Sequence, residues 1–343
     1  MTDMDLNKDN RAQRMAAFLT AAGWGDANLA PMSADASFRR YIRLHLDDQS
    51  TLVMDAPPAH EDVRPFVLVD THLRGLGFSA PDILSEDAEN GFLLLEDFGD
   101  ATFTNLLNSG ADEDMLYALA TDVLIALHAL EIQVVTPEWL PPYNDKRLRD
   151  EAVLLLDWFM PAQGLDVSID ARSAFERIWL DLFAHVHVGP RTLVLRDFHV
   201  DNLMHLPDRP GVKACGLLDF QDALAGHPAY DLMSLLQDAR RDIEPALQAR
   251  MLERYTDALN IHGPARTEFE RAYAILAAQR HAKVIGIFTR LDRRDAKPHY
   301  LNHIARLWRL LEQALTHPAL NEMKAWMDAH IPAAKRHAPD AAS

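Results

Sequence analysis

Three polar residues that stand beside short apolar segments constrain the fold of this chain more than any other feature. Asp197 follows the largely apolar run 192–195, and Asp219 follows a second run, 215–218. Asn202 lies between them, five residues after Asp197 and seventeen before Asp219. Short apolar runs bounded by turn residues are typical of buried strands. We therefore expect a hairpin of two neighbouring strands, whose ends bring the three side chains close together.

The order of these residues is the one in which a protein-kinase-like fold places its catalytic base and two magnesium ligands. Asp197 would accept the hydrogen bond of an attacking hydroxyl group. Asn202 and Asp219 would bind Mg²⁺, which prefers hard oxygen donors. Each residue taken alone fits an ordinary turn equally well, because Asp and Asn side chains bond the local backbone. All three in this order and spacing indicate phosphoryl transfer, with ATP and Mg²⁺ as cofactors.

The charge of the chain limits its partners. It has 34 Lys and Arg residues against 51 Asp and Glu residues, which gives a formal net charge of −17. Nucleic acids and anionic membranes bind basic surfaces, so neither is expected as a partner. Because ATP is itself strongly anionic, its site must supply Mg²⁺ and local Arg or Lys residues against the overall charge.

Composition also bears on location. The polar N-terminal residues lack the apolar segment of a signal peptide, and no apolar run is long enough for a transmembrane helix. A single cysteine, Cys215, excludes an intramolecular disulfide and is compatible with a reducing compartment. We expect a cytoplasmic protein that is a monomer rather than an obligate oligomer.

Periodicity predicts the elements of secondary structure. Alternation over 42–46 and an apolar run over 51–54 predict a hairpin, and 83–85 with 92–95 predict a second one. The segments with helical spacing are 10–22, 63–73, 104–107, 115–130, 147–159, 171–186, 230–242, 245–259, 267–289 and 300–315.

The distribution of these elements predicts an α+β, bilobal, protein-kinase-like fold. The N-lobe over 1–99 would be small and β-rich, with an N-terminal helix, an antiparallel sheet, one further helix and a phosphate loop. The C-lobe over 100–332 would be larger and mostly α-helical. The polar tail over 333–343 is expected to be disordered.

Several stretches of the chain resemble the aminoglycoside phosphotransferase and choline kinase superfamily. These stretches are 35–41, 54–58, 92–99, 195–202, 218–223, 230–241 and 279–291. The resemblance extends over most of residues 15–310. Within the superfamily, the longer stretches look most like the bacterial anomeric kinases of N-acetylmuramate and N-acetylglucosamine that serve peptidoglycan recycling.

The resemblance implies ATP-dependent phosphorylation of the anomeric C1 hydroxyl of an amino sugar, with a nucleotidyltransferase that uses the sugar 1-phosphate. The boundary near residue 100 separately places Glu96 to Phe98 at the hinge between the lobes, where the backbone would hydrogen-bond adenine. Asp231 matches the residue that braces the catalytic loop. Leu195 stands where the superfamily usually has a His two residues before the base.

The resemblance breaks down where phosphate should bind. The second strand should carry a Lys, but Met54 and Asp55 stand there, and helix 63–73 offers no Glu to pair with it, only Asp70. Because both halves of the ion pair are absent together, we interpret the change as a coherent redesign.

We expect other residues of the N-lobe to bind the ATP phosphates. Ser33 and Ser37 belong to a loop of small residues that offers hydroxyl and backbone N–H groups. Arg39 or Arg40 would replace the missing Lys, because Arg binds phosphate bidentately. Adjacent strand residues point to opposite faces, so only one of the two should do so.

An N-acetyl sugar needs hydrogen-bond partners and an apolar surface. The candidates for these contacts are His199, Glu151, Trp158, Gln221, Arg240 and Arg241. The cationic candidates for a lactyl carboxylate are Arg240, Arg241, Arg280 and Lys283.

Two other functions remain open from the sequence. One is a kinase of a different small hydroxyl compound, such as an aminoglycoside, choline or homoserine. The other is a nucleotide-binding pseudokinase that serves as a scaffold. The missing strand Lys favours the pseudokinase, whereas the intact base and both metal ligands oppose it.

Overall fold

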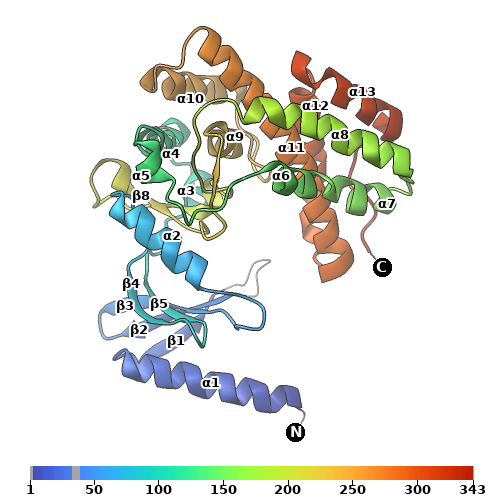
Figure 1. Cartoon of the computed structure of the whole chain (residues 1–343). Coiled ribbons are helices and arrows are strands. Elements are labelled where there is room, and N and C mark those ends of the chain that lie inside the picture. Colours follow the sequence, from blue (N-terminus) through green and yellow to red (C-terminus); the bar gives the residue numbers. More distant parts are fainter. Residues whose placement is uncertain (1–2, 33–38, 343) are drawn as a thin grey trace. The chain divides into compact units, whose positions relative to one another are not determined.

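The computed structural model describes residues 3–32 and 39–342 (Figure 1). The chain forms two compact units. Unit 1 comprises Met1–Ala111 and Asp201–Asp222, and unit 2 comprises Asp112–Val200 and Ala223–Ser343. Among the described residues, no helix is both long and apolar enough to cross a membrane.

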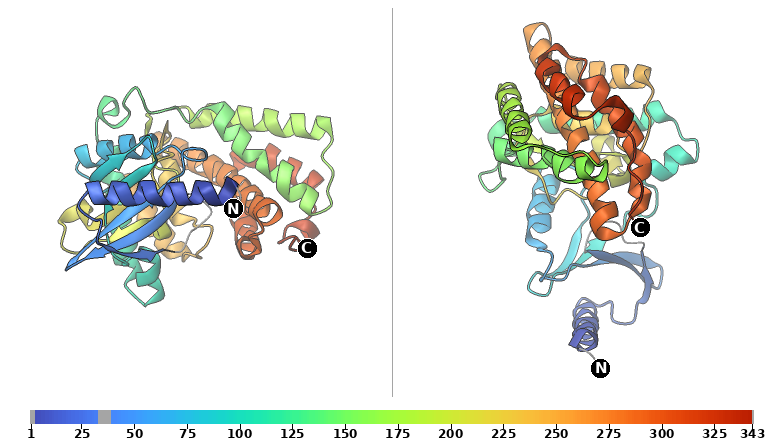
Figure 2. Two further views of the ribbon diagram at one scale, coloured as in Figure 1. Left: turned by 90° about the horizontal axis from the view of Figure 1, so that it is seen from below. Right: turned by 90° about the vertical axis from the view of Figure 1, so that its right-hand side faces the viewer.

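Unit 1 is built on an antiparallel sheet of five strands in the order β1-β2-β3-β5-β4. The strands are β1 Asn28–Pro31, β2 Arg40–Leu46, β3 Gln49–Asp55, β4 Ile83–Asp87 and β5 Phe92–Glu96. Helix α1, Asp3–Ala21, lies along this sheet (Figure 2). Phe18 and Leu19 of α1 belong to one buried cluster with Leu44, Val53 and Phe92 of the strands. Both predicted hairpins are present.

Helix α2, Arg64–Gly75, buries an apolar face in unit 1. A proline at its start suits the first turn, where the missing N–H is no loss. The buried residues are Phe66, Val69, Asp70 and Leu73. The Phe66 ring lies 4.9 Å from the Phe220 ring, which joins α2 to the segment 201–222. Helix α3, Phe103–Asn108, completes unit 1.

The strands around the predicted base and metal ligands pair differently from the expected hairpin. β6, Thr192–Val194, pairs with β9, Leu224–Gly226, in unit 2. In unit 1, β7, Leu203–His205, pairs with β8, Cys215–Leu217. The expected pairing of 192–195 with 215–218 is therefore wrong. Strand β7 is only three residues long and directly follows Asn202, so the sequence contains no apolar run that would predict it.

Unit 2 is mostly helical. Its helices are α4 Glu113–His128, α5 Ile132–Val135, α6 Asp145–Ala152, a π-helix at Leu155–Phe159, α7 Met160–Ala162, α8 Ile169–Val186, α9 Ala229–Leu236, α10 Pro245–Ala258, α11 Pro264–Asp295, α12 Ile304–Ala314 and α13 Asn321–His330. Helix α11 has 32 residues and contacts α12, α9, α6 and α8 (Figure 1). A helix buried on most of its faces cannot be amphipathic, and α11 presents buried polar side chains to the unit's interior.

The C-terminal segment differs from the predicted disordered tail. Lys335 Nζ donates to the Gln163 carbonyl at 2.9 Å, and Gln163 Nε2 donates to the His337 carbonyl at 2.7 Å. Arg336 pairs with Glu312 at 3.0 Å and with Asp328 at 2.7 Å. Composition could not reveal these bonds, because their partners lie in distant parts of the sequence.

Candidate active site

The loop that carries Asp197 is held by Asp231 of α9. Oδ2 of Asp231 accepts a hydrogen bond from the backbone N–H of Leu195 at 2.6 Å, and Oδ1 accepts one from Arg196 at 2.9 Å. Arg196 adopts a left-handed conformation with φ 72°, which costs a non-glycine residue on the order of 1 kcal/mol or more. The two hydrogen bonds offset this cost and fix the backbone directly before Asp197.

Burial strongly affects the charge of Asp231 itself. Burial raises the pKa of its carboxyl group to about 7, although the N–H groups of Leu195 and Arg196 favour the ionised form. The charge of Asp197 acts in the same direction as burial. Asp231 therefore carries only part of a negative charge near neutral pH.

Asp197 is kept ionised by neighbouring cations. Burial alone would raise the pKa of this carboxyl group, but the positive charges of Lys283 and Arg280 outweigh it, and the net shift is downward. A half-buried carboxylate that stays ionised can accept a hydrogen bond from a hydroxyl group. The sequence-predicted base thus has the protonation state that its role requires.

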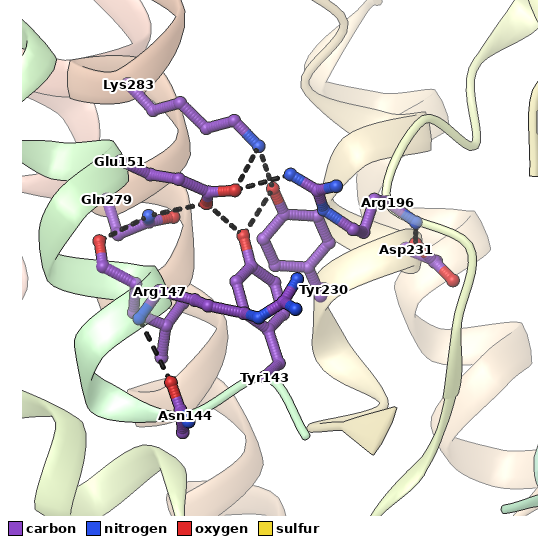
Figure 3. A network of polar contacts seen from close by, with 10 residues as sticks. Tyr143, Asn144, Arg147, Glu151, Arg196, Tyr230, Asp231, Gln279 and Lys283 are labelled. Atoms are coloured by element: carbon purple, nitrogen blue, oxygen red, sulfur yellow. Dashed lines mark hydrogen bonds and ion pairs between the residues drawn. The ribbon is translucent and has the colours of Figure 1, made fainter. Parts of the chain in front are cut away.

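A buried network centred on Glu151 of α6 holds two of the cations near Asp197 (Figure 3). Its carboxylate accepts hydrogen bonds from the Tyr143 hydroxyl and the Arg196 guanidinium. Lys283 Nζ lies 3.1 Å from Oε1, and Gln279 Nε2 lies 3.2 Å from Oε2. A carboxylate offers about four acceptor positions, so these donors occupy them and oppose the sugar contact predicted for Glu151.

His199, Arg240 and Asp238 form a second polar group in unit 2. Arg240 Nη1 lies 3.4 Å from His199 Nε2, and the Arg240 backbone N–H donates to Asp238 Oδ1 at 2.7 Å. Burial lowers the pKa of His199, Asp238 raises it, and Arg240 lowers it again, with a net downward shift. His199 is therefore neutral at pH 7.

Two further candidates for sugar contacts are Arg241 and Trp158. Arg241 Nη2 lies 3.8 Å from Glu113 Oε1, at the start of α4. Trp158 belongs to the π-helix and is half-buried. Both sugar contacts stay predictions.

Asn202 and Asp219, the predicted metal ligands, are neighbours in unit 1. Asn202 Nδ2 lies 3.4 Å from Asp219 Oδ2, and the Leu218 N–H donates to the Asn202 carbonyl at 3.0 Å. One carboxylate and one amide oxygen suit Mg²⁺, which usually binds one or two carboxylates and fills its shell with phosphate oxygens and water. Gln221, a sugar-contact candidate, donates from Nε2 to Asp219 Oδ1 at 2.8 Å.

The two neighbouring arginines have different partners. Arg39 Nη2 lies 3.6 Å from Asp219 Oδ1, and its Nε lies 3.9 Å from Glu61 Oε2. Arg40 pairs with Asp55, the residue opposite it on β3. Arg39 is thus the arginine beside the predicted metal ligands. Of the predicted phosphate contacts, Ser33 and Ser37 lie outside the described residues.

The predicted hinge is fixed by its own side chains. Glu96 pairs with Arg209, whose guanidinium lies over the Phe98 ring at 5.1 Å. A Cβ atom on Gly216 would lie 2.9 Å from that ring, so only glycine fits beneath it. The side chains of Glu96 and Phe98 are therefore used within unit 1, and the Glu96 N–H donates to the Asp82 carbonyl at 2.8 Å. The adenine contact of this backbone stays a prediction.

Sequence reasoning missed several residues of the Glu151 network. Arg196 offered a signal, since it directly precedes the predicted base. Gln279 begins the stretch 279–291 that carries part of the resemblance, but nothing in it pointed to Glu151, and Tyr143 comes from a loop with no motif of its own.

Comparisons with known proteins show the family of the chain. Residues 28–274 match the phosphotransferase enzyme family. An N-acetylmuramate/N-acetylglucosamine kinase from Caulobacter vibrioides is 36% identical over 97% of this chain and 100% of its own length. A protein of the same name from Pseudomonas aeruginosa is 42% identical over 88% of this chain and 89% of its own length.

A solved structure agrees with the fold. A choline/ethanolamine kinase family protein from Mesorhizobium loti matches with a TM-score of 0.62 at 13% identity, over 94% of this chain and 99% of that one. At this identity the likeness establishes the fold alone. It confirms the predicted α+β, protein-kinase-like class.

Proposed function

The chain belongs to the phosphotransferase enzyme family, and from this premise we propose that it phosphorylates the anomeric C1 hydroxyl of N-acetylmuramate and N-acetylglucosamine with ATP and Mg²⁺. The relatives that carry this substrate pair in their names are similar to it over most of their length. The observation that carries the proposal is Asp197, a half-buried carboxylate that is held ionised on a loop fixed by Asp231.

The proposed chemistry assigns one task to each residue. Asp197 accepts the hydrogen bond of the sugar hydroxyl and orients its oxygen for attack on the γ-phosphorus of ATP. It takes up the proton as the new oxygen–phosphorus bond forms and the bond to the leaving ADP breaks. Asp231 keeps the loop in the geometry that this requires. Arg196 and Lys283 are positioned by Glu151 and keep Asp197 ionised.

Asn202 and Asp219 would hold Mg²⁺, which supplies charge neutralisation of the ATP phosphates. Arg39 adds a second positive charge beside Asp219 in place of the absent strand Lys. The backbone of the hinge, from Glu96 to Phe98, binds adenine. A sugar 1-phosphate is the substrate class of a nucleotidyltransferase, so a reaction of that class would consume the product.

A coupled assay of ADP release tests the substrate. N-acetylmuramate, N-acetylglucosamine, an aminoglycoside, choline and homoserine are offered to the same enzyme preparation. We expect turnover with the two amino sugars, and phosphorus NMR should place the phosphate on the anomeric carbon. Turnover with choline, homoserine or the aminoglycoside but with neither amino sugar would overturn the proposal.

An Asp197→Asn variant separates an enzyme from a nucleotide-binding scaffold. We expect turnover to fall about 100-fold to 10,000-fold while ATP still binds, because general-base removal typically costs two to four powers of ten. ATP binding is measured by calorimetry. Undiminished turnover in this variant would remove Asp197 from its role.

A further inference from the structure

Arg280 of α11 is a buried cation whose hydrogen bonding is incomplete. Its side chain lies inside unit 2, with only 4% of the residue exposed. Its Nη1 is buried and, among the described residues, has no hydrogen-bond partner. A buried guanidinium nitrogen without an acceptor is costly. A ligand that brings an acceptor to Nη1 would remove that cost.

The neighbouring cation on the same helix face is already paired. Lys283 lies one turn further along α11, and its Nζ contacts Glu151 at 3.1 Å and the Tyr230 hydroxyl at 3.5 Å. Glu151 also pairs with Arg196 (Figure 3). Glu151 therefore pairs with both Lys283 and Arg196, and the network provides no acceptor for Nη1 of Arg280.

The carboxylates of Asp231 and Asp197, which lie near Arg280, interact with groups other than its Nη1. Asp231 uses both carboxylate oxygens for the backbone N–H groups of Leu195 and Arg196. Asp197 is the carboxylate that must remain available to the sugar hydroxyl. Neither residue makes a hydrogen bond to Nη1 of Arg280.

A second arginine lies close to His199. Arg240 Nη1 is 3.4 Å from His199 Nε2, and its guanidinium lies 5.7 Å from the centre of the Phe288 ring. The pKa of His199 is lowered by burial in the first place, and the charges of Arg240 and Arg280 lower it further against the opposing effect of Asp238. Because the imidazole is neutral, Arg240 and Arg280 are the positive charges that act on His199, against the carboxylates of Asp238 and Asp197.

We propose that Arg280, together with Arg240, forms a carboxylate subsite that binds the lactyl carboxylate of N-acetylmuramate. Arginine binds carboxylates through paired N–H donors, and a carboxylate here would give Nη1 its missing acceptor. N-acetylglucosamine has no such group, so the subsite distinguishes the acidic substrate from the neutral one. The inference rests on the proposed function and adds to it the residues that select between the two sugars.

The subsite is tested by comparing three substrates in wild type and in Arg280→Gln and Arg280→Lys variants. The substrates are N-acetylmuramate, its lactyl methyl ester and N-acetylglucosamine. Truncating one partner of a buried charge pair costs on the order of 30-fold or more in kcat/KM, and we expect that loss for N-acetylmuramate with Arg280→Gln. Arg280→Lys keeps the charge but loses the paired donors, and we expect an intermediate loss.

Because Arg280 also helps to keep Asp197 ionised, both variants should lower kcat/KM for the neutral sugar as well. For N-acetylglucosamine we expect a clearly smaller loss than for N-acetylmuramate, and the difference between the two losses measures the subsite. The methyl ester should already be a poor substrate for wild type, and Arg280→Gln should weaken it no more than it weakens N-acetylglucosamine, because both changes remove the same ion pair. Arg294→Gln is the matched control, since Arg294 is exposed on α11 and pairs only with Asp295 in the described part of the chain.

Two results would overturn the subsite. An equal loss for all three substrates would show that Arg280 serves the phosphoryl group or the fold. A methyl ester as good as N-acetylmuramate in wild type would show that no carboxylate is recognised, and this measurement does not depend on a variant that folds. If wild type phosphorylates neither amino sugar, the proposed function itself fails, which is a distinct outcome.

Discussion

At the scale of single residues, the cation that a phosphate site needs is supplied by one of two adjacent arginines. The Arg39 side chain is 11% exposed and faces Asp219, whereas the Arg40 side chain is 61% exposed and pairs with buried Asp55. Arg11 also pairs with Asp55 and lies over the Phe92 ring at 4.4 Å. Two arginines thus neutralise the carboxylate that stands near the position of the expected Lys.

Alanine variants should separate these two arginines. We expect Arg39→Ala to raise the KM for ATP on the order of tenfold, because a charge-assisted phosphate contact is worth about 1.5–3 kcal/mol. We expect Arg40→Ala to leave that KM near wild type and to lower the melting temperature, because Asp55 loses a partner. Steady-state kinetics and thermal denaturation measure both effects. An unchanged KM for ATP in Arg39→Ala would contradict the assignment.

Asp70 of α2 couples the stability of unit 1 to pH. Its carboxyl oxygens are buried and have no hydrogen-bond partner among the described residues. Burial raises the pKa of Asp70 to about 7, Arg74 lowers it, and the charges of Asp82 and Glu96 raise it further. The folded state therefore holds a proton that the unfolded chain releases near pH 4.

The free energy of unfolding should consequently fall as pH rises from about 4 to about 7 and should level off above that range. Asp70→Asn is neutral at every pH, so we expect the variant to gain roughly 2–3 kcal/mol on wild type between pH 5 and pH 8. Urea denaturation at both pH values measures this difference. Asp62→Asn, at an exposed position, serves as the control. Parallel profiles for wild type and Asp70→Asn would show that Asp70 does not hold the proton.

At the scale of elements, α11 packs closely against the segment that follows α6, because a glycine of α11 lets the backbone of that segment approach. A Cβ atom on Gly286 would lie 2.3 Å from the Leu154 carbonyl carbon, directly before the π-helix Leu155–Phe159. Any side chain there must push this segment away from α11. The segment follows α6, which carries Glu151, so the fit at Gly286 bears on the network around Asp197.

We expect Gly286→Ala to destabilise the protein by about 1–3 kcal/mol or more, because overpacking shifts backbone that cannot relax. The loss should appear as a lower melting temperature and as weaker activity. Gly75→Ala is the matched control, since a Cβ atom at Gly75 meets nothing within 4 Å. Alanine should be neutral or slightly stabilising there. Equal melting temperatures for the two variants would contradict the close approach at Gly286.

The same scale shows why some elements were predictable and others were not. The hairpins β2–β3 and β4–β5 have clear alternation or apolar runs around short turns. The pairs β6–β9 and β7–β8 consist of three-residue strands whose partners are chosen by tertiary packing. The spacing of Asp197, Asn202 and Asp219 was visible because those residues share one motif. The bond from Gln279 to Glu151 joins residues 128 apart, and no local pattern encodes it.

At the scale of the whole molecule, the net charge of −17 has the same sign as the charge of the anionic substrates. Such a charge repels ATP over distances comparable with the Debye length, about 10 Å at 0.1 M salt. Arg39 and Arg280, by contrast, are largely buried, with an 11% exposed side chain and a 4% exposed residue. Salt therefore weakens the long-range repulsion more than it weakens the local attraction.

We expect the association rate of Mg²⁺–ATP to rise about twofold to fivefold as NaCl increases from 20 to 200 mM, because screening removes part of the unfavourable steering. Stopped-flow binding of a fluorescent ATP analogue measures this rate. The KM of the neutral N-acetylglucosamine at saturating ATP should stay nearly constant over the same range, which controls for effects of salt on the fold. A rate that falls with salt would mean that the local arginines dominate the field that ATP meets, and that the acidic surface lies too far from its path to matter.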